Sequence, residues 1–241
     1  MIFEPNGKKS MTISILFISV VFMIIGMIVQ ATLRNKFKKY ANVPIQSRLT
    51  GEEIARSMLQ DHGIYDVRIT SINGQLTDHY NPINKTVNLS HDVFYGNSVA
   101  AAAVAAHECG HAVQHATAYS MLMLRSRLVP LVQISSTLSQ WIIMAGIGFM
   151  GFGGGSPTVL LIGIILFAIT TLFTIVTLPV EFDASARALK WMQAQQITTT
   201  SQQDGARDAL KWAALTYVVA ALASIAMLLQ YILIFMNRSR D

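Results

Sequence analysis

The sequence predicts an α-helical integral membrane protein with four transmembrane helices and a cytoplasmic α+β domain that contains a small antiparallel sheet. Of its 241 residues, 52% are hydrophobic and only 13% are charged, and the mean hydropathy is +0.44. These values lie outside the range of ordinary soluble domains. Four apolar runs each have about the 20 residues needed to cross a hydrocarbon core of about 30 Å. They cover residues 11–33, 128–150, 158–180 and 213–236.

The first apolar run predicts a retained membrane anchor. Lys8 and Lys9 precede it, as basic residues precede a secretory signal. The run is nevertheless too long for the apolar core of a signal peptide, and no pattern of small residues for cleavage follows it. A basic cluster comes next, which is typical of a transmembrane helix that stays in the membrane.

Positive charge is distributed unevenly between the two sides of this predicted topology. Residues 34–127 and 181–212 must share one side, and they carry ten and four Lys or Arg residues. The other side carries only four, which are Lys8, Lys9, Arg238 and Arg240. Because Lys and Arg collect on the cytoplasmic side, we predict that both large segments are cytoplasmic. The external parts are then residues 1–10, the glycine-rich turn at 151–157 and residues 237–241.

The net charge of +5 does not indicate a nucleic-acid-binding protein. Arg34, Lys36 and Lys38 directly follow the first apolar run, and Arg125 and Arg127 directly precede the second. Membrane topology accounts for basic residues at these positions. We therefore expect the lipid bilayer as a partner, and no nucleic acid.

The segment between the first two spans contains signals for a helix and a sheet. Thr50 and Glu53 form a capping-box pattern that predicts a helix through about Asp61, with Gly63 as its stop. Period-two alternation follows at 67–71, 75–77 and 85–90, with an Asn-Gly turn at 73–74. This pattern predicts a small antiparallel sheet just before the next helix.

That next helix contains the motif His107-Glu108-Cys109-Gly110-His111, preceded by a run of alanines. His107 and His111 are four residues apart, so they project from one face of the helix, as zinc ligands must. Glu108 can reach a metal-bound water as general base. The alternative is an ordinary helix with two surface histidines and a glutamate. Cys109 points away from this face and is predicted to be a small buried residue.

Glu181 is the best candidate for a third ligand. It follows the third apolar run, and Pro179 allows a kink there that would direct the carboxylate towards the two histidines. A His₂Glu set leaves a fourth position for water. The alternative is that Glu181 or Asp183 only caps a following helix. His115 lies about 6 Å too far along the helix axis to share the same ion.

At this point the sequence resembles the bacterial membrane neutral zinc metallopeptidases. The resemblance rests on four separated segments, which are 76–82, 104–114, 179–185 and 213–218. More distantly, residues 181–185 are similar to the E-F-x-A-D element of the heat-shock and CAAX-processing membrane proteases. In those proteases the glutamate is the third zinc ligand, and the resemblance implies the same for Glu181. It also implies a zincin-like, gluzincin-like cytoplasmic domain.

One residue departs from that element. The aspartate that orients a zinc-binding histidine in those proteases is replaced by Ser185. A hydroxyl can accept the same N–H bond without charge, and Asp183 or Asp78 could supply the missing charge.

The resemblance also suggests which residues line the cleft. In zinc peptidases with this motif, the strand before the helix borders the cleft, and its free edge pairs with an extended substrate. We therefore expect Val87, Asn88, Leu89 and Ser90 to line the cleft, with an ordinary sheet edge as the alternative. His79 is a candidate for contacting substrate or stabilising an oxyanion.

The resulting prediction is a multi-pass zinc metalloendopeptidase of the bacterial plasma membrane, with its active site on the cytoplasmic side. One catalytic Zn²⁺ would activate a water, and Glu108 would take its proton. The expected partners are peptide or protein substrates, including membrane proteins. The alternative is a non-catalytic zinc-binding membrane scaffold or regulator. A transporter is disfavoured because the spans contain almost no ionisable residues.

Overall fold

The computed structural model describes residues 6–151 and 156–238, and the chain divides into two compact units. An apolar helical unit comprises Met1–Ile28, Leu124–Thr177 and Tyr217–Asp241. A mixed unit comprises Val29–Met123 and Leu178–Thr216. Most of the turn predicted at 151–157 falls on residues 152–155, which lie outside the described residues.

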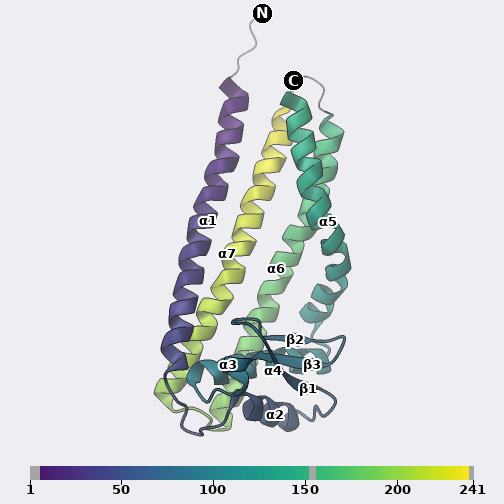
Figure 1. Cartoon of the computed structure of the whole chain (residues 1–241). Coiled ribbons are helices and arrows are strands. Elements are labelled where there is room, and N and C mark those ends of the chain that lie inside the picture. The colour runs from purple at the N-terminus through teal and green to yellow at the C-terminus, as the bar shows by residue number, and fades with distance from the viewer. Residues whose placement is uncertain (1–5, 152–155, 239–241) are drawn as a thin grey trace, which may run out of the picture. The chain divides into compact units, whose positions relative to one another are not determined.

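Four long helices pass through the apolar helical unit (Figure 1). Each is long and apolar enough to cross a membrane, which confirms the four predicted candidate spans. The helices are longer than the apolar runs because their polar ends continue the helix. They are α1 (Asn6–Ala41), α5 (Ser120–Gly151), α6 (Pro157–Ala194) and α7 (Thr200–Arg238).

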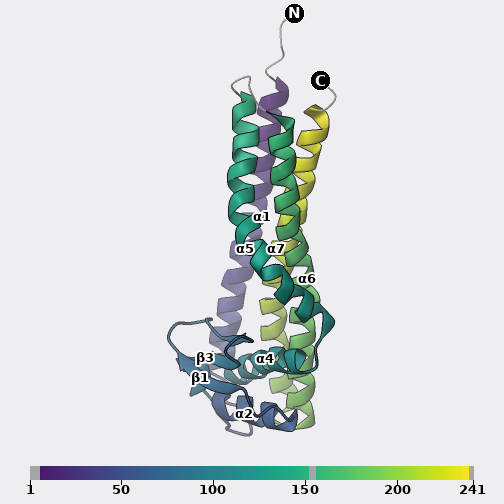
Figure 2. The ribbon, with the colours of Figure 1, turned by 90° about the vertical axis from the view of Figure 1, so that its right-hand side faces the viewer.

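The helical segments of this unit expose apolar side chains outward and bury a smaller apolar cluster. Phe17 is 68% exposed and Trp141 is 64% exposed, which suits contact with hydrocarbon. Inside the unit, Leu160 and Ile234 belong to a buried cluster that also receives partly buried side chains. These segments run side by side (Figure 2).

In the mixed unit, α6 continues through Pro179 and Glu181 without ending. Neither Glu181 nor Asp183 therefore caps a new helix, and the end of the third span at residue 180 stays a prediction. A proline removes one backbone hydrogen bond, but packing can compensate for that loss. Val180, Ala184 and Ala188 recur every four residues and are all fully buried, so this face of the helix is held by the core.

The mixed unit also contains three shorter helices and a sheet. The helices are α2 (Gly51–Asp61), α3 (His91–Phe94) and α4 (Val99–Ala116). The capping box is confirmed, since Thr50 accepts from the Glu53 N–H while Glu53 accepts from the Thr50 N–H. Gly63 follows α2 with φ +69°, a conformation that favours glycine. The alanine-rich part of α4 lies in the core.

The sheet is mixed, and its order is β1-β3-β2. β1 (Arg68–Ile72) pairs in parallel with β3 (Thr86–Ser90), beside which it lies in Figure 2, and β2 (His79–Asn81) pairs antiparallel with β3. The prediction of an all-antiparallel sheet with a strand at 75–77 is therefore wrong. Alternation reveals strands but not their partners. β3 is the most buried strand and takes the central position.

Candidate metal centre

The histidine motif lies on α4, whose local sequence explains its position. Ser98 accepts a hydrogen bond from the Ala101 N–H over 3.2 Å and so caps the helix start. The following alanines favour helix and fit closely against their neighbours. His107 and His111 therefore lie one turn apart, with ring centroids separated by 4.8 Å.

α6 supplies the third potential ligand. Glu181 is only 3% exposed, and its Oε2 lies 3.4 Å from His107 Nε2 and 3.6 Å from His111 Nε2. The potential ligand atoms of the three residues all lie within 4.8 Å of one another. Zinc bonds of about 2.0–2.2 Å in a tetrahedron place neighbouring ligand atoms about 3.3 Å apart. The two nitrogens and one oxygen therefore fit zinc in both chemistry and spacing.

Gly110 allows α6 to approach α4 this closely. A Cβ atom at Gly110 would lie 2.6 Å from the Ala184 carbonyl oxygen, which is a steric overlap. The Ala184 side chain is fully buried, so the backbone at this point has little room to move away. The absent side chain thus brings Glu181 within reach of the histidine pair.

The electrostatic environment of His111 reflects this geometry. Burial acts to lower the pKa of His111, but the hydrogen bond and the charge of Glu181 outweigh burial and raise it. The buried Glu181 carboxylate thus favours the protonated form of His111. A bound metal cation would take the place of that proton.

Glu108 is hydrogen-bonded to the sheet. Its Oε2 accepts a hydrogen bond from the Tyr80 N–H over 3.0 Å. Among the described residues, that group holds His107, His111 and Glu181 but not Glu108. The arrangement leaves Glu108 beside the group, where a general base would have to lie.

The edge that we expected to be free at residues 87–90 is partly covered. β3 pairs with β1 along its length, and residues 86–88 also pair with β2, so this part of the strand has no free edge for a substrate. Val87 and Leu89 are fully buried, while Asn88 bonds Thr70. β2 covers part of the edge that we assigned to the substrate, and the expectation that residues 87–90 line the cleft stays a prediction. β2 is the strand that borders Glu108.

Each histidine of the motif has a hydrogen-bond partner at its other ring nitrogen. Ser185 Oγ lies 3.1 Å from His107 Nδ1, so the residue that replaces the aspartate of related proteases contacts a motif histidine. Gln114 Oε1 lies 3.0 Å from His111 Nδ1. Asp78 contacts neither histidine in this way, because its carboxylate accepts from the Ser90 N–H over 2.6 Å.

The sequence predicted neither a role for Gln114 nor the contact between Tyr80 and Glu108. Gln114 stands three residues after His111, so helical spacing alone places both on one face of α4. Its amide also donates to Asp183 over 2.8 Å, which links that predicted residue to the site indirectly. Tyr80 gave no signal, because its contact with Glu108 is made by the backbone.

The other histidines near the sheet have partners of their own. His79 is exposed, and its Nδ1 lies 2.8 Å from the Thr77 carbonyl oxygen while its Nε2 lies 3.2 Å from Asn88 Nδ2. His115 Nδ1 lies 2.9 Å from the Tyr80 hydroxyl, in agreement with its expected role as a polar neighbour. Cys109 is fully buried as predicted, and burial raises the pKa of its thiol.

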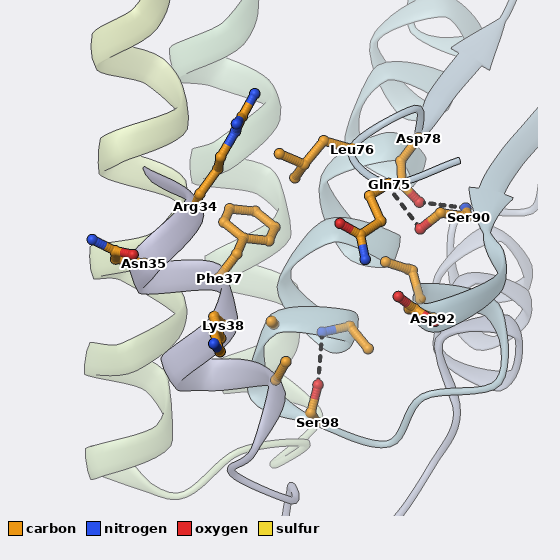
Figure 3. Close-up of a pocket in the computed structure, with 14 residues that line it drawn as sticks. Arg34, Asn35, Phe37, Lys38, Gln75, Leu76, Asp78, Ser90, Asp92 and Ser98 are labelled. Carbon is orange, nitrogen blue, oxygen red and sulfur yellow. Dashed lines mark hydrogen bonds between the residues drawn. The ribbon is translucent and has the colours of Figure 1, made fainter. Parts of the chain in front are cut away.

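A cavity of about 500 Å³ opens elsewhere in the mixed unit (Figure 3). It lies between the end of α1 and the loop before β2, with Phe37 and Leu76 on facing walls. Asp78 and Ser90 form part of its wall, where they are hydrogen-bonded to each other. None of the three potential metal ligands lines this cavity, so it is separate from the metal centre.

Comparison with known proteins agrees with the site. The sequence profile of the family described as "Putative neutral zinc metallopeptidase" matches residues 15–236. The chain belongs to this family. The resemblance that the sequence motifs indicated is thereby confirmed for nearly the whole chain.

A curated relative of the chain carries a similar description. The chain is 40% identical over 208 residues to "Putative membrane protease YugP" of Bacillus subtilis (strain 168). The match covers 86% of this chain and 90% of the relative. No solved structure matches the chain significantly.

Proposed function

We propose that the chain is an integral membrane zinc metalloendopeptidase that cleaves peptide bonds with Glu108 as general base. The observation that carries this proposal is the spacing of His107, His111 and Glu181, whose potential ligand atoms lie within 4.8 Å of one another. A buried set of three ligands leaves one position of a tetrahedron open, which is typical of catalytic and not structural zinc sites. The family description supports the same activity.

His107, His111 and Glu181 would hold one Zn²⁺. Zinc in such a site polarises a carbonyl group and lowers the pKa of water to about 7. Glu108 would accept a proton from the attacking water and pass it to the leaving amine. The Tyr80 N–H bonds only one of its oxygens, Oε2, so that bond would orient the carboxylate while the other oxygen takes the proton.

β2 would take the place that we first assigned to β3 as the substrate-binding edge. The Tyr80 N–H points to Glu108, and therefore away from β3. In a strand, the N–H and C=O of one residue point to the same side. The Tyr80 carbonyl would thus be available to an extended peptide that approaches along this edge.

The membrane location of the proposed enzyme suggests the class of its substrates. The four candidate spans and the name of the relative support a multi-pass membrane protein. The charge distribution supports a cytoplasmic active site in the bacterial plasma membrane. We propose that peptides and proteins are substrates, among them membrane proteins whose cleaved segments lie near the bilayer.

The test uses the full-length protein purified in detergent, with zinc content and cleavage of unfolded casein as measurements. The wild type should bind about one zinc ion and cleave casein. Glu108→Gln should keep zinc and lose at least about 100-fold in turnover. Glu181→Ala should lose zinc. The control is Glu52→Gln. Glu52 lies on α2 and pairs with Arg56, so this variant should keep both its zinc and its cleavage of casein.

Two results would count against the proposal. If Glu181→Ala binds zinc and cleaves like the wild type, Glu181 is not a ligand. If the wild type binds zinc but cleaves neither casein nor membrane-protein substrates, the chain is the non-catalytic scaffold or regulator.

A further inference from the structure

Gln114 joins one proposed zinc ligand, His111 on α4, to the residues that flank another, Glu181 on α6. It is fully buried, and its Oε1 lies 3.0 Å from His111 Nδ1 on its own helix α4. Its Nε2 donates to α6 twice, to the Val180 carbonyl over 2.7 Å and to Asp183 Oδ2 over 2.8 Å. These two acceptors stand one residue before and two residues after Glu181.

The chemistry of these partners determines which way the amide points. A backbone carbonyl and an ionised carboxylate can only accept hydrogen bonds. The NH₂ group of Gln114 must therefore face Val180 and Asp183, and its oxygen must face His111. An oxygen there requires a proton on His111 Nδ1, which in the neutral ring leaves Nε2 unprotonated. Nε2 is the atom that lies 3.6 Å from Glu181 Oε2.

Asp183 is itself paired with an arginine. The Arg187 Nε donates to Asp183 Oδ2 over 2.5 Å, and the Arg187 guanidinium lies 5.8 Å from the centroid of the Tyr119 ring. A carboxylate paired with arginine keeps its acceptor character. The direction of the Gln114 amide is therefore set by a chain of contacts that reaches the surface.

The partner of the other histidine gives no such direction. Ser185 Oγ lies 3.1 Å from His107 Nδ1, and a hydroxyl can either donate or accept. Either tautomer of His107 is compatible with this single contact. The contact with Gln114 thus selects one tautomer of His111, whereas the contact with Ser185 selects none for His107.

We propose that Gln114 is a positioning residue that fixes the tautomer of His111 and holds α4 and α6 at the separation that zinc requires. The inference rests on the proposed zinc site and deepens it. One amide would do both tasks, because its oxygen sets the ring of one ligand while its nitrogen holds the backbone beside the other. Groups that orient metal-bound histidines typically contribute about 10–100-fold in metal affinity.

The sharpest variant is Gln114→Glu, which keeps the size and the oxygen facing His111 but removes the donor. The new carboxylate would face the Val180 carbonyl and the Asp183 carboxylate, which repel it. We expect the zinc dissociation constant, measured by competition with a chelator, to rise by about 10–100-fold. Adding Asp183→Asn supplies an NH₂ donor from the other side, and the double variant should recover most of the lost affinity.

Gln203 offers a matched control within the same unit. It is 7% exposed, donates to the Leu189 carbonyl over 2.7 Å and accepts from the Thr198 hydroxyl over 2.7 Å. Gln203→Glu should therefore reduce thermal stability like Gln114→Glu while leaving zinc affinity within about threefold of the wild type. Gln114→Met, which is uncharged and similar in size, should weaken zinc binding even if the glutamate variant fails to fold.

The outcomes separate this inference from the proposed function. Wild-type protein that binds no zinc would contradict the proposed function itself. Three results would overturn only the role of Gln114: unchanged zinc affinity in its variants, equal losses of zinc affinity in Gln114→Glu and Gln203→Glu, or no recovery in the double variant. A merely structural role predicts no such recovery, because a second substitution would add to the damage.

Discussion

The Tyr80 N–H and the Glu108 carboxylate are joined by a hydrogen bond of 3.0 Å. This bond connects the outer edge of β2 to the residue that directly follows the first motif histidine. A short edge strand is thereby attached to the proposed base, and its position on β3 is set by only three residue pairs. The backbone of Tyr80, more than its side chain, orients Glu108.

Substitutions at Tyr80 separate the backbone contribution from that of the ring. Tyr80→Ala and Tyr80→Pro both remove the ring and its contact with His115, but only proline also removes the N–H. Proline is tolerated where the N–H of an edge strand points away from the sheet. We expect casein turnover to fall at least about 10-fold further in Tyr80→Pro than in Tyr80→Ala, with equal zinc content. Equal turnover would show that the N–H does not orient Glu108.

Gly110 should be intolerant of a side chain. In Gly110→Ala the added Cβ would lie 2.6 Å from the Ala184 carbonyl, so α6 would have to move and carry Glu181 with it. Overpacking of this kind costs about 1–3 kcal/mol. We expect a lower thermal unfolding midpoint and a zinc affinity reduced by at least about 10-fold.

Gly26 provides the control for this substitution. It lies in α1, where an added Cβ would meet nothing within 4 Å. Gly26→Ala should therefore not lower the unfolding midpoint, since alanine favours helix more than glycine does, and it should leave zinc affinity unchanged. If both variants behave alike, close packing of the helices at Gly110 does not set the site.

Ser185 should contribute through its hydroxyl alone. Ser185→Ala leaves His107 Nδ1 without the group that lies 3.1 Å away, and we expect zinc affinity to fall about 10-fold. Ser185→Thr keeps the hydroxyl and should retain affinity. Ser185→Asp would place a charged acceptor there, as in the related E-F-x-A-D proteases, and should raise affinity. Chelator competition measures all three, and the same affinity in every variant would exclude this role.

Asp78 should make stability depend on pH in a direction opposite to that of most acidic residues. Burial raises its pKa above the ordinary value of 3.8, although the hydrogen bonds from Ser90 lower it in part. The folded protein therefore binds this proton more tightly than the unfolded chain. The contribution to stability is fully present below pH 3.8 and is lost as the pH rises through the raised pKa.

Asp78→Asn tests this dependence. An asparagine can still accept from the Ser90 N–H but does not titrate. The unfolding midpoint of the wild type, relative to that of the variant, should fall as the pH rises from below 3.8 towards neutrality. A difference between the two midpoints that is constant across this range would contradict the expected titration.

Much of the organisation could be predicted from the sequence because local rules determine it. The four apolar runs follow from the thickness of the bilayer, and all four correspond to helices in the structure. The capping box at Thr50 and the turn of helix that separates His107 from His111 depend only on nearby residues. Glu181 could be proposed because it resembles the third ligand of related proteases.

The pairing of the strands and the support of the site depended on the tertiary structure. Alternation marked strands near residues 68–72 and 86–90 but could not tell that β1 and β3 pair in parallel. Nor could it show that β2, and not β3, borders Glu108. Strand partners are chosen by contacts between residues distant in sequence, which a local pattern does not contain.

The sequence by itself determined the candidate membrane spans, the motif helix and the types of residue that could bind zinc, because each depends on spacing along one helix or on composition. Only the tertiary structure brought Glu181 within 3.6 Å of both histidines and placed Gln114 between α4 and α6. Those contacts join residues about 70 positions apart. They exist because Gly110 lets the two helices pack closely. This close packing depends on the positions of both backbones, which the sequence alone does not give.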